Sequence, residues 1–150
     1  MELALPRTED GRPYFVYLSL EGKALGRADR TALSLGPGEV ALLALLPEPL
    51  ASVEVRPLGG EFRPGGEAKF VLTLKTAGGK RPQGRHVLSV KVIGPDGRVL
   101  KHYCRSVEAP SGRGVFGFKL ALNDAPGEWR VEARDAATGV KGSARFVVKP

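Results

Sequence analysis

Apolar and charged side chains alternate along residues 127–148, near the end of the chain. Trp129, Val131 and Ala133 occupy every second position, and the residues between them are charged. A period of two is typical of a strand with one buried face, because successive side chains point to opposite sides. A turn ending at Gly139 then returns the chain with the same alternation. The pattern predicts a hairpin whose apolar face must be covered by a second sheet.

Short strands separated by turn residues account for the rest of residues 51–150. The strands expected before the hairpin are 52–56, 68–76, 86–93, 98–107 and 115–122. The inward-facing positions include Leu88, Val90, Val92, Phe116, Phe118, Leu120 and Leu122. Roughly seven strands in about 100 residues are typical of an immunoglobulin-like β-sandwich. The sequence therefore predicts an all-β fold.

Residues 1–50 predict a smaller β region. Strands are expected at 14–20, 31–35 and 39–46, and the last is interpreted as a buried strand because it is apolar on both faces. Three strands cannot close a sandwich, so this region is expected to be the tail of an upstream β-sandwich. Pro47-Glu48-Pro49 forms a stiff linker, which places the boundary near residue 50. The predicted domains are residues 1–50 and 51–150.

Positive charge is concentrated in the second domain. Residues 1–50 carry five Lys/Arg and seven Asp/Glu (−2), and residues 51–150 carry eighteen and nine (+9), giving a net charge of +7. A basic domain raises nucleic acid or an acidic partner as candidates. The cations fall mainly at outward strand positions and no nucleic-acid motif accompanies them, so no specific nucleic-acid binding is expected.

Candidate catalytic groups are few. His102 and Cys104 would share one face of the strand 98–107, but no third orienting group or oxyanion motif accompanies them. Glu128 and Glu132 would lie about 13 Å apart along one strand and are interpreted as solvated partners of neighbouring arginines. One cysteine and two histidines fall short of a disulfide or a structural zinc site. We therefore expect no enzyme activity, cofactor or metal.

Glycan binding is a further candidate, because sugar-binding modules often present exposed aromatic rings. Trp129 is in phase with Val131 and is expected in the core. Tyr103 falls on the other face of its expected strand and is the candidate glycan contact.

Two stretches resemble known families. The last strands resemble those of macroglobulin-type immunoglobulin-like domains, through residues 123–131 (NDAPGEWRV), 135–139 (DAATG) and 146–148 (FVV). The first half is similar to the C-terminal β-sandwich regions of large bacterial glycoside hydrolase and β-galactosidase-like proteins. The residues that carry this second likeness are 26–30 (GRADR), 35–47 (LGPGEVALLALLP), 92–97 (VIGPDG) and His102-Tyr103. This resemblance implies a catalytic domain upstream of Met1, and no catalytic residue is carried over from it.

These observations favour a non-catalytic C-terminal accessory module of a larger carbohydrate-active protein, serving packing, spacing or subunit contact. Its expected partners are an upstream catalytic domain or another subunit. The alternative is a free-standing glycan-binding or nucleic-acid-binding module. No apolar run approaches the roughly 20 residues of a membrane span, so no membrane insertion is expected. No signal peptide is recognisable, so the chain expressed alone would stay in the cytoplasm. A secreted parent would make it extracellular.

Overall fold

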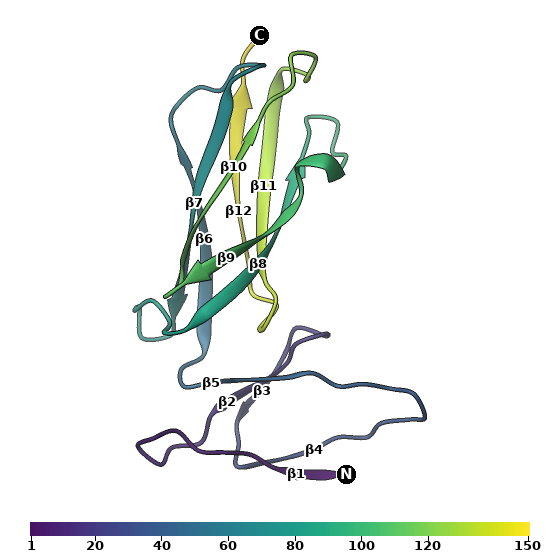
Figure 1. Cartoon of the computed structure of the whole chain (residues 1–150), viewed down its shortest axis with the longest axis vertical. Coiled ribbons are helices and arrows are strands. Elements are labelled where there is room, and N and C mark those ends of the chain that lie inside the picture. The colour runs from purple at the N-terminus through teal and green to yellow at the C-terminus, as the bar shows by residue number, and fades with distance from the viewer.

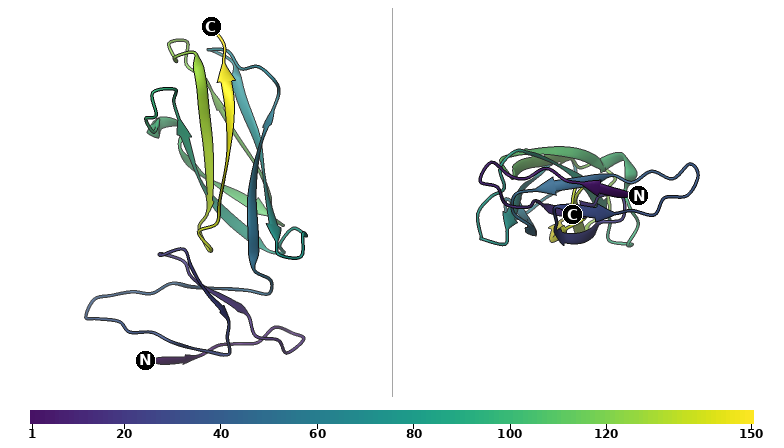
Figure 2. Two further views of the ribbon diagram at one scale, coloured as in Figure 1. Left: turned by 180° about the vertical axis from the view of Figure 1, so that it is seen from behind. Right: turned by 90° about the horizontal axis from the view of Figure 1, so that it is seen from below.

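The computed structural model describes all 150 residues and shows two parts joined end to end (Figure 1). Residues 50–150 form a sandwich of two antiparallel sheets, as the alternating pattern predicts. Residues 1–46 form a smaller part with five short strands. The molecule is elongated, and the two ends of the chain lie at its opposite ends (Figure 2).

Seven strands build the sandwich. They are β6 (Leu50–Leu58), β7 (Glu67–Thr76), β8 (Arg85–Ile93), β9 (Arg105–Pro110), β10 (Arg113–Lys119), β11 (Gly127–Asp135) and β12 (Lys141–Val148). One sheet has the strand order β10-β7-β6 and the other β12-β11-β8-β9. All neighbouring pairs are antiparallel.

The predicted hairpin is formed by β11 and β12. Trp129 lies opposite Phe146 and Val131 lies opposite Ala144, so the two apolar faces coincide. Gly139 ends the connecting turn with φ of 77°, a backbone conformation in which a side chain would be strained.

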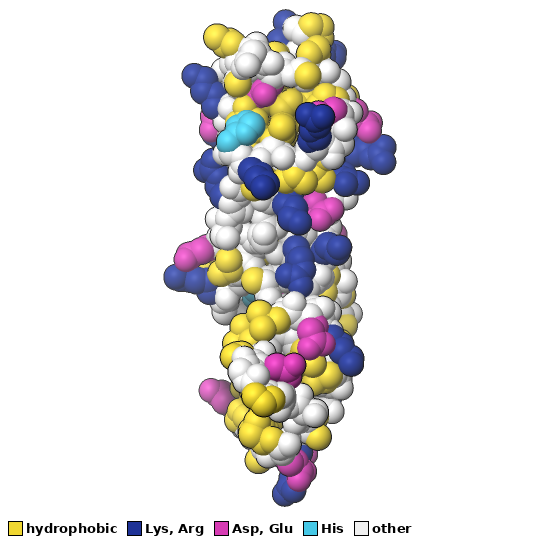
Figure 3. Space-filling view, turned by 90° about the vertical axis from the view of Figure 1, so that its right-hand side faces the viewer, with side chains coloured by type: hydrophobic (Ala, Val, Ile, Leu, Met, Phe, Trp, Pro, Cys, Tyr) yellow, Lys and Arg dark blue, Asp and Glu magenta, His cyan; other side chains and the backbone are white.

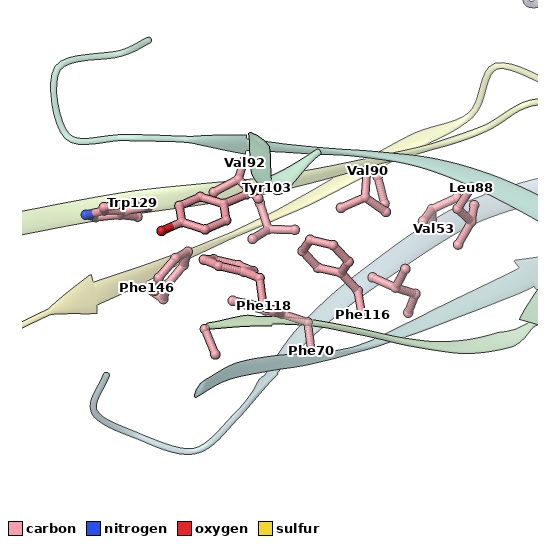
Figure 4. Close-up of a cluster of buried hydrophobic side chains, with 14 of the residues drawn as sticks. Val53, Phe70, Leu88, Val90, Val92, Tyr103, Phe116, Phe118, Trp129 and Phe146 are labelled. Atoms are coloured by element: carbon pink, nitrogen blue, oxygen red, sulfur yellow. The ribbon is translucent and has the colours of Figure 1, made fainter. Parts of the chain in front are cut away.

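Aromatic rings from both sheets fill the centre of the sandwich (Figure 4). Phe70 of β7 packs on Phe146 of β12 with ring centroids 5.1 Å apart, and Trp129 lies 5.9 Å from Phe146. The predicted inward positions 116, 118 and 120 are buried. Leu122 is 86% exposed, so its predicted burial is wrong. The strand β10 ends at Lys119, and the turn that follows no longer keeps the period of two.

The two sheets also approach each other along their edges. At one edge β12 lies beside β6, where Val148 forms a parallel bridge with Phe62. At the other edge β9 lies beside β10, and a Cβ on Gly114 would stand 2.7 Å from the carbonyl oxygen of Glu108. The sandwich is therefore closed on both sides by its own strands.

The N-terminal part is much thinner. Its strands are β1 (Glu2–Ala4), β2 (Phe15–Leu18), β3 (Lys23–Arg27), β4 (Arg30–Ala32) and β5 (Leu43–Leu46). They form one sheet of order β1-β4 and another of order β3-β2-β5. Within residues 1–46 only Val16, Tyr17 and Ser19 are buried.

The buried strand predicted at residues 39–46 forms only in its second half, and there its side chains are half-buried rather than buried. Regular pairing begins only at Leu43, and Val40 is 77% exposed. The run is apolar on both faces, but no second layer covers it here. The strands β1 and β3 were not predicted, because they are short and mix polar with apolar residues.

Hydrogen bonds and close contacts hold the two parts together around the linker 47–49. The amide of Leu50 donates to the hydroxyl oxygen of Tyr17 at 3.1 Å, and the amide of Ala77 donates to the carbonyl oxygen of Pro49 at 2.9 Å. A Cβ on Gly139 would stand 2.6 Å from the Cα of Gly22, so two turns touch where neither has a side chain. That residues 51–150 fold alone, whereas residues 1–50 do not, stays a prediction.

Candidate functional site

Tyr103, the candidate glycan contact, points into the sandwich. Its side chain is only 7% exposed, so the expectation of an exposed ring is wrong. The expected strand 98–107 does not form as a unit. Residues 101–103 make one turn of 3-10 helix (η1, Lys101–Tyr103), and β9 starts at Arg105. The turn breaks the strand alternation and directs the tyrosine ring inward, beside Trp129 and Phe118 (Figure 4).

The hydroxyl of Tyr103 ties η1 to the loop after β10. It donates to Oδ2 of Asp124 at 2.5 Å and accepts from the amide of Ala121 at 3.0 Å. Burial raises the pKa of the Tyr103 phenol, and the hydrogen bond to Asp124 raises it further. The Tyr103 hydroxyl therefore has a structural role, because it already donates one hydrogen bond and accepts another.

No aromatic side chain of the chain is fully exposed. All ten Phe, Trp and Tyr residues are buried or half-buried. A glycan platform needs a ring face open to solvent, and only Tyr14 and Phe15 are half-buried rather than buried. Glycan binding as such stays a prediction, now without the residue proposed for it.

Tyr17 is the second tyrosine whose pKa is raised. It lies at the junction of the two parts, where burial raises its phenol pKa and the nearby negative charge of Asp135 adds to the effect. Its hydrogen bond from Leu50 acts in the opposite direction and is the smaller effect.

We expect these two tyrosines to make stability fall at alkaline pH. Their pKa is higher in the folded protein than the ordinary value of about 10, so the unfolded chain loses these protons first. The contribution is complete below about pH 10 and is lost as pH rises further. Denaturant unfolding from pH 8 to 11 should show this decline, and the Tyr17→Phe/Tyr103→Phe variant should show a shallower one. An equal slope in both proteins would contradict the assignment.

His102 and Cys104 do not form a catalytic pair. His102 is exposed in η1, and its ring lies over the ring of Tyr103. The sulfur of Cys104 contacts the carbonyl oxygen of Leu100 at 3.4 Å. No hydrogen bond joins the two side chains. A strand would have placed His102 and Cys104 on one face, but the 3-10 turn separates them.

Of the two hairpin glutamates interpreted as partners of arginines, only Glu128 forms an ion pair. Glu128 accepts from Arg145 at 3.0 Å on the outer face of the hairpin. Asp96 caps its own turn by accepting from the amide of Arg98 at 3.0 Å. No three His, Cys, Asp or Glu side chains are grouped as metal ligands would be.

The sequence analysis missed one polar cluster. Asp135 is fully buried; its Oδ1 lies 2.9 Å from Nδ1 of His86, and its Oδ2 accepts from the amide and hydroxyl of Thr138. The sequence pattern could have predicted this burial. Asp135 follows the inward positions 129, 131 and 133 at the same spacing of two, and His86 lies two residues before the inward Leu88. The cluster fixes the end of the sandwich that faces the N-terminal part.

The cations of the sandwich lie mainly on its outer surface (Figure 3). Lys69, Lys91, Arg130 and Arg145 are exposed at outward strand positions, as predicted. The structure contains no helix long and apolar enough to cross a membrane.

Comparisons with known proteins find similarity at the level of structure. No protein-family model matches the chain, and no curated protein matches it in sequence. The native conformation of E. coli alpha-2-macroglobulin is similar over 93% of this chain and 10% of that one, with 21% identity and a TM-score of 0.54. A mutant Salmonella alpha-2-macroglobulin is similar over 93% of this chain and 11% of that one, with 21% identity and a TM-score of 0.55.

The comparisons confirm an immunoglobulin-like, macroglobulin-type β-sandwich fold. The chain spans about a tenth of the length of these macroglobulins, at 10% and 11%. A mutant β-glucosidase from Listeria innocua is also similar, over 66% of this chain and 16% of that one, with 17% identity and a TM-score of 0.39. That likeness is too low to support an origin in glycoside hydrolases.

Proposed function

We propose that the chain is a non-catalytic structural module of a larger, macroglobulin-like protein, and that its N-terminal part packs against a neighbouring domain or subunit. The observation that carries this proposal is a group of apolar side chains left exposed on the N-terminal part. Leu20, Leu35, Val40 and Leu42 are 67%, 43%, 77% and 55% exposed. A hollow of about 510 Å³ with a mixed apolar and polar lining lies beside them.

The two parts differ in how well they cover their apolar residues, and this difference supports the N-terminal part as the contact region. The sandwich buries a core of 20 residues and closes both of its edges. The N-terminal part leaves Val40 and Leu42 exposed and has almost no core of its own. A surface of this kind is typical of a contact region, because soluble proteins rarely leave large apolar patches uncovered. The sandwich would then serve as the spacer.

The similarity to macroglobulins supports a multidomain setting. It extends over both parts of the chain, since 93% of the residues are covered, yet it uses only a tenth of the larger proteins. The combination of both parts therefore recurs as a small portion of a longer polypeptide. A carbohydrate-active parent, expected from the sequence resemblance, has no comparable support. A free-standing glycan-binding module is the weaker candidate, because no aromatic side chain is fully exposed.

The proposal predicts that the isolated chain associates through its N-terminal part. Sedimentation velocity on the full chain should show self-association that added salt does not reverse, because apolar contact drives it. The variant Val40→Ser/Leu42→Ser should weaken association on the order of tenfold, since two apolar side chains are removed from the contact.

The matched control is Val115→Ser/Leu122→Ser, which removes two exposed apolar side chains from the sandwich. It should leave association unchanged. A wild-type chain that stays monomeric at all accessible concentrations, or equal effects of the two variants, would refute the proposed contact region.

A further inference from the structure

A cleft lies where the two parts of the molecule meet. Its volume is about 520 Å³, and both parts contribute to its walls. The N-terminal part and the linker supply Arg12 and Glu48. The last residue of β7, Thr76, and the loop between β7 and β8, with Lys80, Arg81 and Gln83, supply the other wall. Clefts at the junction of two structural units are frequent binding sites.

The cleft has an excess of positive charge. Glu48, its only carboxylate, is already engaged by Arg12 at 3.5 Å and by Arg27 at 3.4 Å. Lys80 and Arg81 are exposed, and neither lies within 4.0 Å of a carboxylate. Two neighbouring cations therefore face the cleft without a partner.

The loop that carries these cations also offers backbone donors. The amides of Gly78, Lys80 and Arg81 donate to no other atom of the chain. Such free amides beside a cation are suited to the two oxygens of a carboxylate.

The loop is held in place at both ends. The amide of Thr76 donates to the carbonyl oxygen of Lys80 at 2.7 Å, and the amide of Ser111 donates to that of Gly84 at 2.7 Å. Between these bonds Pro82 is buried against Gly112, where a Cβ would stand 2.6 Å from the proline ring. The loop is thus anchored before a ligand arrives, which lowers the entropy cost of binding.

We propose that this cleft binds an acidic segment of another polypeptide, with two of its carboxylates on Lys80 and Arg81. Two unpaired cations match two carboxylates. They are too few for a nucleic acid, whose binding proteins typically neutralise about 6–10 phosphates. The carboxylates of Glu48 and Asp10 would also repel a continuous phosphate backbone. Asp10 lies near the cleft because it accepts a hydrogen bond from Arg12. The inference does not depend on the module proposed above, because it concerns a different surface.

Fluorescence anisotropy with a labelled hexaglutamate peptide tests the proposal on the full chain. At an ionic strength of about 50 mM the wild-type protein should bind the peptide, because screening is weak there. The variant Lys80→Ala/Arg81→Ala should bind about tenfold more weakly, the effect expected from two partly exposed charge contacts. Both side chains are exposed, so the variant should fold, and its thermal melt checks this.

The matched control is Lys91→Ala/Arg130→Ala, which removes the same two charges from the outer face of β8 and β11. It should change the affinity by less than about twofold, since neither side chain lines the cleft. Equal weakening by both variants would overturn the site, because net charge alone would then explain binding. Absence of peptide binding to the wild-type chain would overturn it as well. Tighter binding of a single-stranded oligonucleotide with six phosphates, equally sensitive to Lys80 and Arg81, would replace the acidic peptide with nucleic acid.

Discussion

Replacing Gly142 with alanine is expected to lower the free energy of unfolding by about 3–5 kcal/mol, among the largest effects of a single methyl group. A Cβ at this position would fall onto the carbonyl oxygen of Val53 and within 2.7 Å of its carbonyl carbon. The obstructing atoms are backbone atoms, and Val53 is held opposite Leu74 in the neighbouring strand. Relief therefore requires β12 to move away from β6. Urea unfolding followed by the fluorescence of the single tryptophan measures the loss.

Gly60→Ala is the control for this experiment. No atom lies within 4 Å of the Cβ that it would add, and the residue has no positive φ. Its effect should stay within about 0.5–1 kcal/mol and favours the folded state slightly, because alanine restricts the unfolded chain. If Gly142→Ala were equally harmless, the close contact between β6 and β12 would be wrong.

Trp129→Ala is expected to cost about 3–5 kcal/mol, the range for removal of a large buried aromatic ring. The side chain is 1% exposed and packs on Phe146 and Tyr103. Its indole Nε1 also donates to the carbonyl oxygen of Ala125 at 2.9 Å, so the substitution removes a hydrogen bond together with the packing. Circular dichroism during denaturation is the suitable measurement, because the variant lacks the fluorescent residue.

Val147→Ala provides the comparison for Trp129. Val147 lies on the outer face of β12, opposite Glu128, and is exposed. Truncation there should cost less than about 1 kcal/mol, as for surface substitutions in general. A cost below about 1 kcal/mol for Trp129→Ala itself would mean that the ring is open to solvent. It would also restore Trp129 as a candidate for stacking on a sugar.

The sandwich was predictable because its information is local. The alternation around Trp129 and around Phe116 records which side of each strand is buried, and a period of two leaves little ambiguity. The turn residues indicate where one strand ends and the next begins, as Gly139 does between β11 and β12. Seven strands of this kind have few arrangements other than two packed sheets, so the fold class followed from the pattern.

The failures lie where a position depends on contacts with distant residues. Tyr103 is buried because one helical turn interrupts an expected strand. Its hydroxyl donates to Asp124, which lies two strands further along the chain. Val40 was expected inside because it is apolar, yet burial requires a second layer that the N-terminal part does not contain. The unpaired cations Lys80 and Arg81 were visible in the sequence. Their place in a cleft depends on how the two parts meet, which the local pattern does not record.

The neighbouring positions of β6 and β12 also determine how the sandwich responds to mechanical force. The chain enters through β6 at the end next to the N-terminal part and leaves through β12 at the far end (Figure 1). The two strands run in the same direction, as the parallel bridge between Phe62 and Val148 shows. Tension between the two ends therefore pulls these strands past each other along their length. Contacts sheared in this way carry the load together, whereas contacts that are peeled apart break one after another. Pulling the two ends of the sandwich apart therefore requires the contacts between β6 and β12 to shear together.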